Sequence, residues 1–359
     1  MALTKVSTGV VDMSGNTGGL IIAKGTTAQQ PTCTAANLGS IRENTTENKV
    51  EVCTADGGTP AWQFLEEAGS SFVPLTVDYL VVAGGGNGGG NVGAGYSGGG
   101  GGGAGGLRTS YGSTSGGGAS AESSLSLSTG TSYIVTVGAA SSEQTQGNSS
   151  TFYTITSTGG GFGGKFTGYA AGNGGSGGGA PGWDNPNAAN PGSGTAGQGY
   201  NGGSSVILTE DGAGGGGGAS AVGSNSNGSS GGNGGAGLEV NIIGGTGNFY
   251  AGGGGGGGYT GGNGGSAGSG GGGNGGGNNN SPTNGAANTG GGGGGAWVSS
   301  TASRPGGSGV VILRYPSAYA INFQTGVGFI SSTATLSATS EKVTTITAGS
   351  GTITFALTP

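Results

Sequence analysis

The sequence contains no histidine and few charged residues. Of its 359 residues, only 7% are Asp, Glu, Lys or Arg, and the formal net charge is -6. Histidine is the commonest general base and a frequent metal ligand, so its absence removes most catalytic and metal-binding arrangements. Between Arg108 and Arg304 the only basic residue is Lys165. Binding to nucleic acid or to anionic lipid needs clustered cations, so we expect neither partner.

Long apolar segments are missing as well. No apolar run approaches the ~20 residues of a membrane-spanning helix. Residues 1–10 lack the apolar core of about 7–15 residues that a secretory signal requires. We therefore expect a protein without an export signal, one that leaves its cell by lysis or inside a particle.

Cysteine is scarce too, with only Cys33 and Cys53. Two thiols are too few for a disulfide scaffold. They flank a pattern of strand, turn and strand over residues 41–52, in which Val50 and Val52 alternate with polar residues. A disulfide closing this loop would add on the order of 3 kcal/mol. Two reduced, buried thiols are the alternative, and the sequence leaves the choice open.

Glycine, in contrast, is abundant and supplies 100 residues. Such a composition usually indicates a disordered, low-complexity segment. Two features favour a folded glycine zone over residues 76–316 instead: apolar, strand-like runs bracket and interrupt it, and linkers of this length are rare. Helical periodicity is absent, and glycine in a helix costs ~1 kcal/mol per residue relative to alanine. We therefore predict a folded zone without α-helices.

A folded glycine zone must be stabilised by its backbone, because ordering glycine costs more entropy than ordering any other residue. An extended helix with ~3 residues per turn points its N–H and C=O groups outward. Where every side chain is hydrogen, such helices can pack side by side and satisfy one another. Collagen is excluded, since glycine does not recur at every third position and proline totals 10. The sequence predicts a bundle of polyglycine-type helices, with few sheet ladders between residues 84 and 305.

Two apolar runs frame this zone. Residues 77–83 and residues 310–315 are its most apolar borders, and both are rich in Val and Leu. Continuous apolar runs of this length are typical of strands buried on both faces. We predict that the two runs are neighbouring strands in the base of one folded unit.

Four zones divide the chain. Residues 1–24 form an N-terminal attachment arm, which we expect to become ordered only on a partner, because one apolar run cannot form a core. Residues 25–75 form a small β module, and residues 76–316 form the glycine-rich domain. Residues 317–359 form a C-terminal β tail, with alternating strands and a Gly-Ser-Gly turn. The predicted fold class is mainly β and irregular, with essentially no α-helix.

No catalytic or cofactor-binding motif withstands inspection. Glycine strings of the dinucleotide-binding type occur throughout, but without the helix and the acidic residue that the motif requires. Residues 159–166 approach a phosphate-binding loop, yet Phe166 stands where Ser or Thr must hold magnesium. The carboxylate pairs at residues 66–67 and 210–211 are typical of solvated loops. A Ser–His pair cannot exist without histidine, so we predict no enzymatic activity, no cofactor and no metal.

Several segments resemble phage proteins. Residues 79–86 (Tyr-Leu-Val-Val-Ala-Gly-Gly-Gly) and residues 306–316 resemble the opening and closing of the glycine-rich domain found in many phage fibre proteins. Residues 103–109 and 133–138 match the same pattern. Residues 25–62 resemble a short β module that is common in phage tail-fibre and virion structural proteins. The glycine zone is also similar to the tip adhesin of T-even-type long tail fibres, although that adhesin lacks the N-terminal module and C-terminal tail of this chain.

The resemblance implies a sandwich of glycine helices whose variable loops, at the far end, meet the host receptor. On this basis we expect a structural virion fibre or fibre-tip adhesin, exposed on the particle surface. Its loops would bind a host glycan or outer-membrane protein, and its N-terminal arm would bind other virion proteins. Fibres are often trimers, so we expect a homotrimer, although no heptad repeat specifies one. The alternatives are a capsid-attached head fibre or decoration protein, and a purely structural glycine-rich coat protein.

Exposed aromatic residues are the candidate receptor contacts, because they give a large contact area at a low entropy cost. The candidates lie in stretches of the glycine zone that are neither strand nor pure glycine: Trp183, Tyr200, Tyr259 and Trp297. Rings that cap helix ends and pack inward are the alternative for each. Trp183 is the foremost candidate, since flanking prolines would hold its loop rigid. Its replacement by alanine is expected to lower host adsorption without affecting the fold.

Overall fold

The computed structural model divides the chain into two compact units, Met1–Val73 and Pro74–Pro359, which we describe separately. Most of the arm predicted for residues 1–24 lies outside the described residues, as does Trp183. The structure describes residues 23–47, 49–55, 59–64, 74–90, 98–142, 144–165, 169–182, 190–206, 211–278, 280–297, 304–324 and 328–358.

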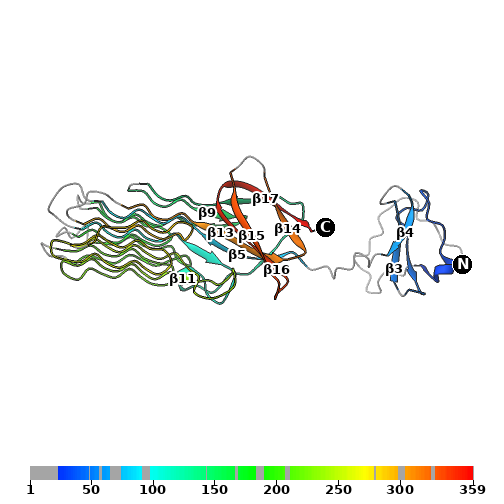
Figure 1. Cartoon of the computed structure of the whole chain (residues 1–359), viewed down its shortest axis with the longest axis horizontal. Helices are drawn as coiled ribbons and strands as arrows, with labels where there is room; N and C mark the ends of the chain where they lie inside the picture. Colours follow the sequence, from blue (N-terminus) through cyan, green and yellow to red (C-terminus); the bar gives the residue numbers. More distant parts are fainter. Residues whose placement is uncertain are drawn as a thin grey trace. The chain divides into compact units, whose positions relative to one another are not determined.

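A four-stranded sheet forms the β module of the first unit (Figure 1). Strand β1 runs parallel to β2, and the other neighbours pair antiparallel in the order β1-β2-β3-β4. The 3-10 turn η1 (Thr27–Gln29) follows β1. The strands are β1 (Ala23–Gly25), β2 (Ile41–Asn44), β3 (Lys49–Thr54) and β4 (Ala61–Phe64). The predicted strand, turn and strand over residues 41–52 are therefore confirmed.

The buried residues of β3 are Glu51 and Cys53, and the alternating Val50 and Val52 are half-buried. Glu51 forms an ion pair with Arg42, whose Nε lies 3.3 Å from Oε1 of Glu51. Pairing removes the main penalty for burying the two charges, so a glutamate can occupy the buried face of this strand.

A disulfide joins Cys33 and Cys53. Their Cα atoms lie 5.4 Å apart, and 20 positions separate them in the sequence. Closing a loop of this length restricts the unfolded chain and stabilises the fold by on the order of 3 kcal/mol. The bond ties the loop before β2 to the centre of the sheet, in a unit too small to build a large core.

Two sheets form the base of the second unit. Strands β5 (Thr76–Val82) and β13 (Val310–Pro316) pair antiparallel within a six-stranded sheet of order β15-β16-β13-β5-β6, in which β7 also pairs with β5. A five-stranded sheet has the order β10-β9-β8-β17-β14. The prediction that residues 77–83 and 310–315 form neighbouring strands in one unit is confirmed. The remaining elements before the C-terminal segment are β6 (Leu107–Thr109), η2 (Gly116–Gly118), β7 (Leu125–Ser126), β8 (Tyr133–Thr136), β9 (Ser150–Phe152), β10 (Ile155–Ser157), β11 (Leu238–Glu239) and β12 (Phe249–Tyr250).

Strands β5 and β13 are buried on both faces, as their continuous apolar runs predicted. One face packs against the five-stranded sheet in a core that includes Tyr79, Tyr315 and Phe355. The opposite face packs against a second cluster that includes Leu80, Ile312 and Ile242. The two strands thus form the centre of the hydrophobic base.

The C-terminal segment belongs to this base. It contains β14 (Tyr319–Phe323), β15 (Ile330–Leu336), β16 (Glu341–Ala348) and β17 (Ser350–Leu357). Strand β16 pairs with β13, and β17 pairs with β8, so the segment completes both sheets. The zone expected as a C-terminal tail over residues 317–359 is therefore not a separate folded unit. Its alternating pattern indicated strands correctly, but strand pattern alone does not identify the strand's partner.

Two clusters of charged and aromatic side chains lie in the base, one around Glu122 and one around Arg314. Arg108 donates from Nε to Oε1 of Glu122 at 2.7 Å, and the hydroxyl of Tyr79 donates to Oε2 of Glu122 at 2.8 Å. Burial and the contact with Glu122 raise the pKa of Tyr79, so its phenol stays a donor. Burial alone would raise the pKa of Glu341, but the hydrogen bonds from Arg314 and Thr339 and the charge of Arg314 together outweigh it, and the pKa is lowered. Arg314 also stacks over Tyr111, at 4.9 Å from the ring centroid.

The glycine-rich part of the second unit is a lattice of extended segments (Figure 1). Residues 98–107 show the hydrogen-bond pattern that connects these segments. Every third N–H group along the segment donates to the same neighbouring segment. The three bonds to residues 290–296 are Gly99 to Ala296, Gly102 to Gly293 and Gly105 to Gly290. A repeat of three is the repeat of an extended threefold helix.

The same segment bonds to six neighbours. Over residues 98–106, its N–H groups donate to residues 290–296, 158–164 and 214–217, and its carbonyls accept from residues 83–89, 176–182 and 254–257. Donor–acceptor distances run from 2.7 to 3.0 Å. Among the described residues between 84 and 305, the sheet strands are only two to four residues long. The prediction of laterally packed glycine segments with few sheet ladders is confirmed.

Asparagine side chains complete the lattice at its surface. A segment on a flank has no neighbour on its outer side, so its outward N–H needs another acceptor. Five such N–H groups donate to an asparagine Oδ1 at 2.8 to 2.9 Å: Ser193 to Asn173, Gly194 to Asn201, Ser204 to Asn225, Ser266 to Asn233 and Ala267 to Asn274. The side-chain amide thus replaces the backbone of a missing neighbour.

Candidate functional site

The lattice has one end far from the sheets, which we call the distal end. Residues 98–107 run from it to β6 in the base, and Figure 1 shows the glycine segments extending away from the sheets. Tight turns reverse the chain there. Lys165 donates its N–H to the carbonyl of Tyr169 at 3.0 Å, and Gly262 donates its N–H to the carbonyl of Tyr259 at 2.8 Å. Each turn is thus carried by two hydrogen-bonded segments of the lattice, which hold it in place.

Tyr259 and Trp297 both lie at the distal end and are half-buried. The N–H of Tyr259 donates to the carbonyl of Ser229 at 2.7 Å. A Cβ placed on Gly276 would lie 3.0 Å from Cβ of Trp297, so Trp297 packs against that glycine segment. The indole Nε1 of Trp297 is shielded from solvent and has no hydrogen-bond partner among the described residues. Both rings therefore combine a packed side with a partly exposed side.

Tyr200 lies elsewhere. A Cβ on Gly118 would lie 2.5 Å from the Tyr200 hydroxyl, which places this ring against η2, next to the base. Its segment accepts from the N–H of Gly177 and donates to the carbonyl of Gly218. The structure therefore brings Tyr259 and Trp297 to the same end of the lattice, but not Tyr200. For Trp183 only the preceding Gly182 is described, and its N–H donates to Gly98 at 3.0 Å at the distal end.

Tyr169 is a distal aromatic residue that the sequence analysis missed. Its side chain is 59% exposed, the largest exposure of any aromatic side chain among the described residues. Val206 is a second exposed apolar residue close to this end, at 39%. The signal for Tyr169 was its place in a short break between two glycine segments, the same signal that pointed to Tyr259.

The ion pairs of the described residues lie away from the distal end. All four are in the β module or in the base: Lys24–Glu43, Arg42–Glu51, Arg108–Glu122 and Arg314–Glu341. Lys165 reaches Oε1 of Gln144 at 3.4 Å, and Nε of Arg304 donates to the carbonyl of Pro282 at 2.9 Å. The described part of the distal end thus offers a ligand aromatic surface, backbone and amide hydrogen bonds and the ammonium of Lys165.

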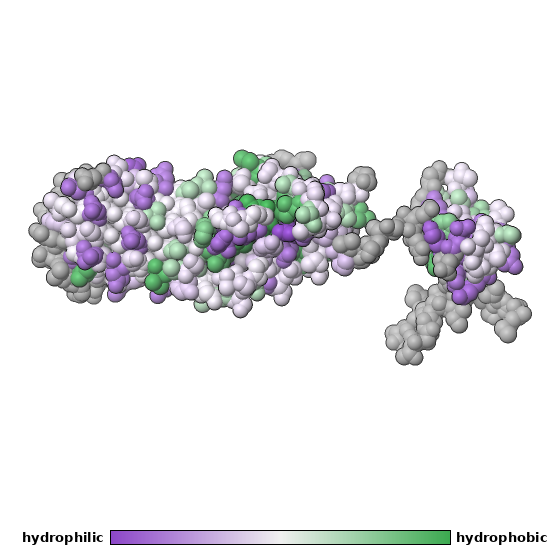
Figure 2. Space-filling view, turned by 60° about the horizontal axis from the view of Figure 1, so that its bottom comes forward, coloured by the Kyte–Doolittle hydropathy of each residue, from purple (hydrophilic) through white to green (hydrophobic). Residues whose placement is uncertain are grey.

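The surface of the second unit is more polar over the glycine-rich part than over the sheets. Figure 2 shows hydrophilic residues scattered over its glycine-rich part, while apolar colour gathers mainly over the sheets. The strongly exposed apolar residues of the base include Ile243, Phe249 and Ile330.

In the described ranges no group of three or more Cys, Asp or Glu is arranged to hold a metal ion. No helix in that part of the chain has the length and hydropathy to cross a membrane.

Comparison with known proteins identifies the family of the glycine-rich part. A family model described as a glycine-rich domain matches residues 54–316. The match covers β5, the whole lattice and β13, which frame the glycine zone in the structure. No curated protein and no solved structure matches the chain. Because the matched residues make up well over half of the chain, the protein belongs to the glycine-rich domain family.

Proposed function

We propose that this protein is a structural bacteriophage virion fibre or fibre-tip adhesin whose distal end contacts the host surface. The observation that carries the proposal is the exposed Tyr169 at the same end of the lattice as Tyr259 and Trp297. Rings on rigid supports give a large contact area and lose little entropy on binding. The ligand would be a host glycan or an outer-membrane protein, since aromatic and amide groups suit both.

The lattice supports a mechanical role. Each central segment is bonded to six others. A distal turn can therefore bind a ligand under force, or change in sequence, while the hydrogen bonds of the lattice keep its two segments in place. The base closes the lattice through β5 and β13, which hold both ends of the glycine zone together. Such a body suits a rigid display element better than it suits catalysis. We further propose that the assembled fibre is a homotrimer.

The test of the receptor contact is an adsorption assay with particles that carry Tyr169→Ala. We expect the adsorption rate to fall about tenfold, because one exposed aromatic anchor is commonly worth over 1 kcal/mol. Phe249→Ala is the matched control, since Phe249 is 40% exposed but lies on β12 in the base. Trp183→Ala belongs in the same series.

Equal adsorption of all three variants and the parent would contradict the proposal. An equal loss in the Phe249 control would move the contact to the base. Thermal unfolding of each variant shows whether the fold is retained.

The test of attachment is a deletion of residues 1–22, which leaves β1 complete from Ala23. We propose that this arm binds other virion proteins and contributes nothing to the lattice. Purified deletion protein should therefore unfold at the parental temperature, while its incorporation into particles is lost.

Normal incorporation would assign attachment to another part of the chain. Images of the labelled parent would show whether it sits on the tail or on the capsid. A capsid position would favour the head-fibre or decoration alternative.

A further inference from the structure

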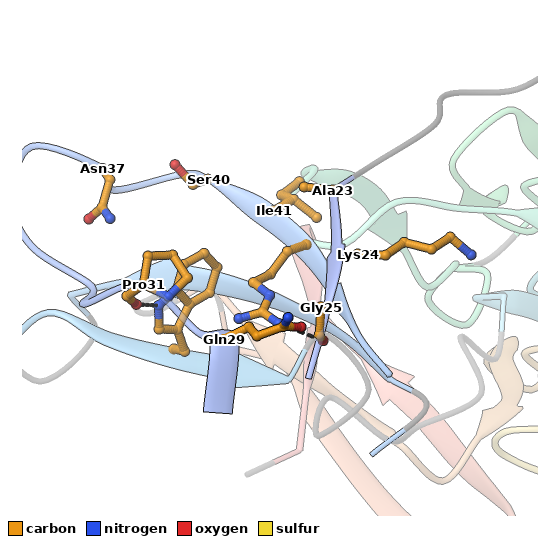
Figure 3. A pocket seen from close by; sticks show the side chains of 10 residues that line it. Ala23, Lys24, Gly25, Gln29, Pro31, Asn37, Ser40 and Ile41 are labelled. Carbon is orange, nitrogen blue, oxygen red and sulfur yellow. Dashed lines mark hydrogen bonds between the residues drawn. The ribbon is translucent and has the colours of Figure 1, made fainter. Parts of the chain in front are cut away.

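The β module has a pocket that the fibre function does not use (Figure 3). Its volume is about 430 Å³, within the range of small-molecule sites. Strands β1 and β2 form one side, and η1 and the loop before β2 form the other. The lining residues are Ala23, Lys24, Gly25, Gln29, Pro31, Asn37, Ser40, Ile41, Arg42 and Trp62.

Arg42 is a charged residue that is buried in this lining, with only 5% of its surface exposed. Its Nη2 donates to the carbonyls of Gly25 at 2.6 Å and Thr26 at 2.9 Å, and its Nε faces Glu51. Its Nη1 is shielded from solvent and has no hydrogen-bond partner among the described residues. Because a water-sized molecule cannot reach Nη1, a ligand in the pocket cannot reach it either, so Arg42 forms part of the wall without offering a free donor.

Trp62 supplies the aromatic side of the pocket. Its Nε1 donates to the carbonyl of Pro31 at 2.6 Å, and Figure 3 shows that bond as a dashed line at Pro31. The bond fixes the orientation of the indole, whose side chain is only half-buried. A fixed indole is a suitable stacking surface for a ligand with an apolar face.

The other polar side chains of the pocket favour a ligand rich in acceptors. Oε1 of Gln29 accepts from the N–H of Thr26 at 2.9 Å, and Oδ1 of Asn37 accepts from the N–H of Thr34 at 2.6 Å. With their oxygens engaged, both amides offer only N–H groups. Nδ2 of Asn37 already donates one of its two N–H groups to the carbonyl of Thr32 at 2.9 Å, so one is left for a ligand. An apolar ligand would leave these remaining donors unpaired.

The charges around the pocket balance. Lys24 pairs with Glu43 at 2.7 Å, and Arg42 pairs with Glu51. A charged ligand would therefore meet no unpaired opposite charge. These features favour a compact, neutral ligand with many oxygens and one apolar face.

We propose that this pocket binds a neutral saccharide of roughly one or two rings. The CH face of a sugar ring stacks on Trp62, and its oxygens accept from the amides of Gln29 and Asn37. The site would give the protein a second contact with a glycan surface, on a different unit from the distal end. The inference is independent of the receptor contact proposed for Tyr169.

The experiment uses the full chain on an array of neutral oligosaccharides built from glucose, galactose, mannose and N-acetylglucosamine, with affinities measured by calorimetry. We expect binding to a subset of the array. Ser40→Phe should weaken it at least tenfold by filling the pocket, because Ser40 is exposed and only its backbone is hydrogen bonded. Trp62→Ala should weaken it as much, while Trp62→Phe keeps part of the affinity.

Leu38→Phe is the matched control, since Leu38 is 45% exposed and outside the lining. Its affinity should equal that of the parent, as should that of Tyr169→Ala. No binding by the parent to any neutral glycan would overturn the proposal, and so would unchanged affinity in a folded Ser40→Phe variant. Loss of binding in Tyr169→Ala alone would place the saccharide at the distal end instead.

Discussion

Gly255→Val is expected to unfold the second unit at temperatures where the parent chain is fully folded. A Cβ on Gly255 would lie 2.0 Å from the carbonyl oxygen of Gly265 and 2.9 Å from the N atom of Gly275. Both are backbone atoms fixed by lattice hydrogen bonds, so relief of the clash must break several of those bonds. We expect a loss of about 3 kcal/mol or more, measured by thermal or denaturant unfolding. A domain of ordinary stability has a free energy of unfolding of about 5–15 kcal/mol, so a loss of this size removes a large share of it.

Gly245→Ala is the control for this substitution. Gly245 lies in a turn with φ +75° and has nothing within 4 Å of the position of a Cβ, so alanine there meets backbone strain but no neighbour. We expect a cost of ~1 kcal/mol, well below that of Gly255→Val. Equal unfolding temperatures for Gly255→Val and the parent would show that Gly255 lies outside a close-packed lattice.

Removal of the C-terminal segment should have an effect of similar size. A chain that ends at Pro316 loses β16 and β17, which uncovers β13 on one side and β8 on the other. It also loses Ile346, Ile353 and Phe355, which are at most 1% exposed in the core between the two sheets. We expect no cooperative unfolding transition for the second unit of this truncated chain, measured by calorimetry.

The single substitution Phe355→Ala also tests whether the C-terminal segment stabilises the core. The ring of Phe355 contacts Tyr315 edge-on, with the centroids 5.4 Å apart. Loss of a fully buried Phe side chain costs about 3–5 kcal/mol. Leu357→Ala is the matched control on the same strand, because Leu357 is 63% exposed. If the truncated chain and Phe355→Ala both melted like the parent, residues 317–359 would be an independent tail after all.

The strand frame was predictable because side chains determine it. Residues 77–83 and 310–315 carry apolar side chains on both sides, and only a strand buried on both faces accommodates that pattern. The glycine lattice was predictable for the opposite reason, since long runs without side chains can be ordered only through backbone bonds. Both inferences rest on composition and periodicity, which the sequence shows directly.

The arrangement within the lattice was not predictable. Nothing in a glycine run tells Gly102 to bond with Gly293, because glycines are chemically identical. The sequence grouped Tyr200 with Tyr259 and Trp297, and its place next to the base could not be predicted, since the neighbours of its segment are set by lattice position and not by pattern. The burial of Glu51 could not be predicted either, because its ion pair with Arg42 depends on β2, which local alternation in β3 cannot reveal.

The pairing of β5 with β13 has a consequence for how the protein is made. It joins residues 76–82 to residues 310–316, and lattice bonds such as that from Gly102 to Gly293 also span most of the chain. Contacts of such long sequence separation slow folding. The base cannot close until β13 has left the ribosome, and at about 5–20 residues per second that takes roughly 15–60 s. During that interval glycine is the commonest residue between the two strands, and it has no apolar side chain through which chains could aggregate. The composition that builds the lattice therefore also lowers the risk of aggregation before the base closes.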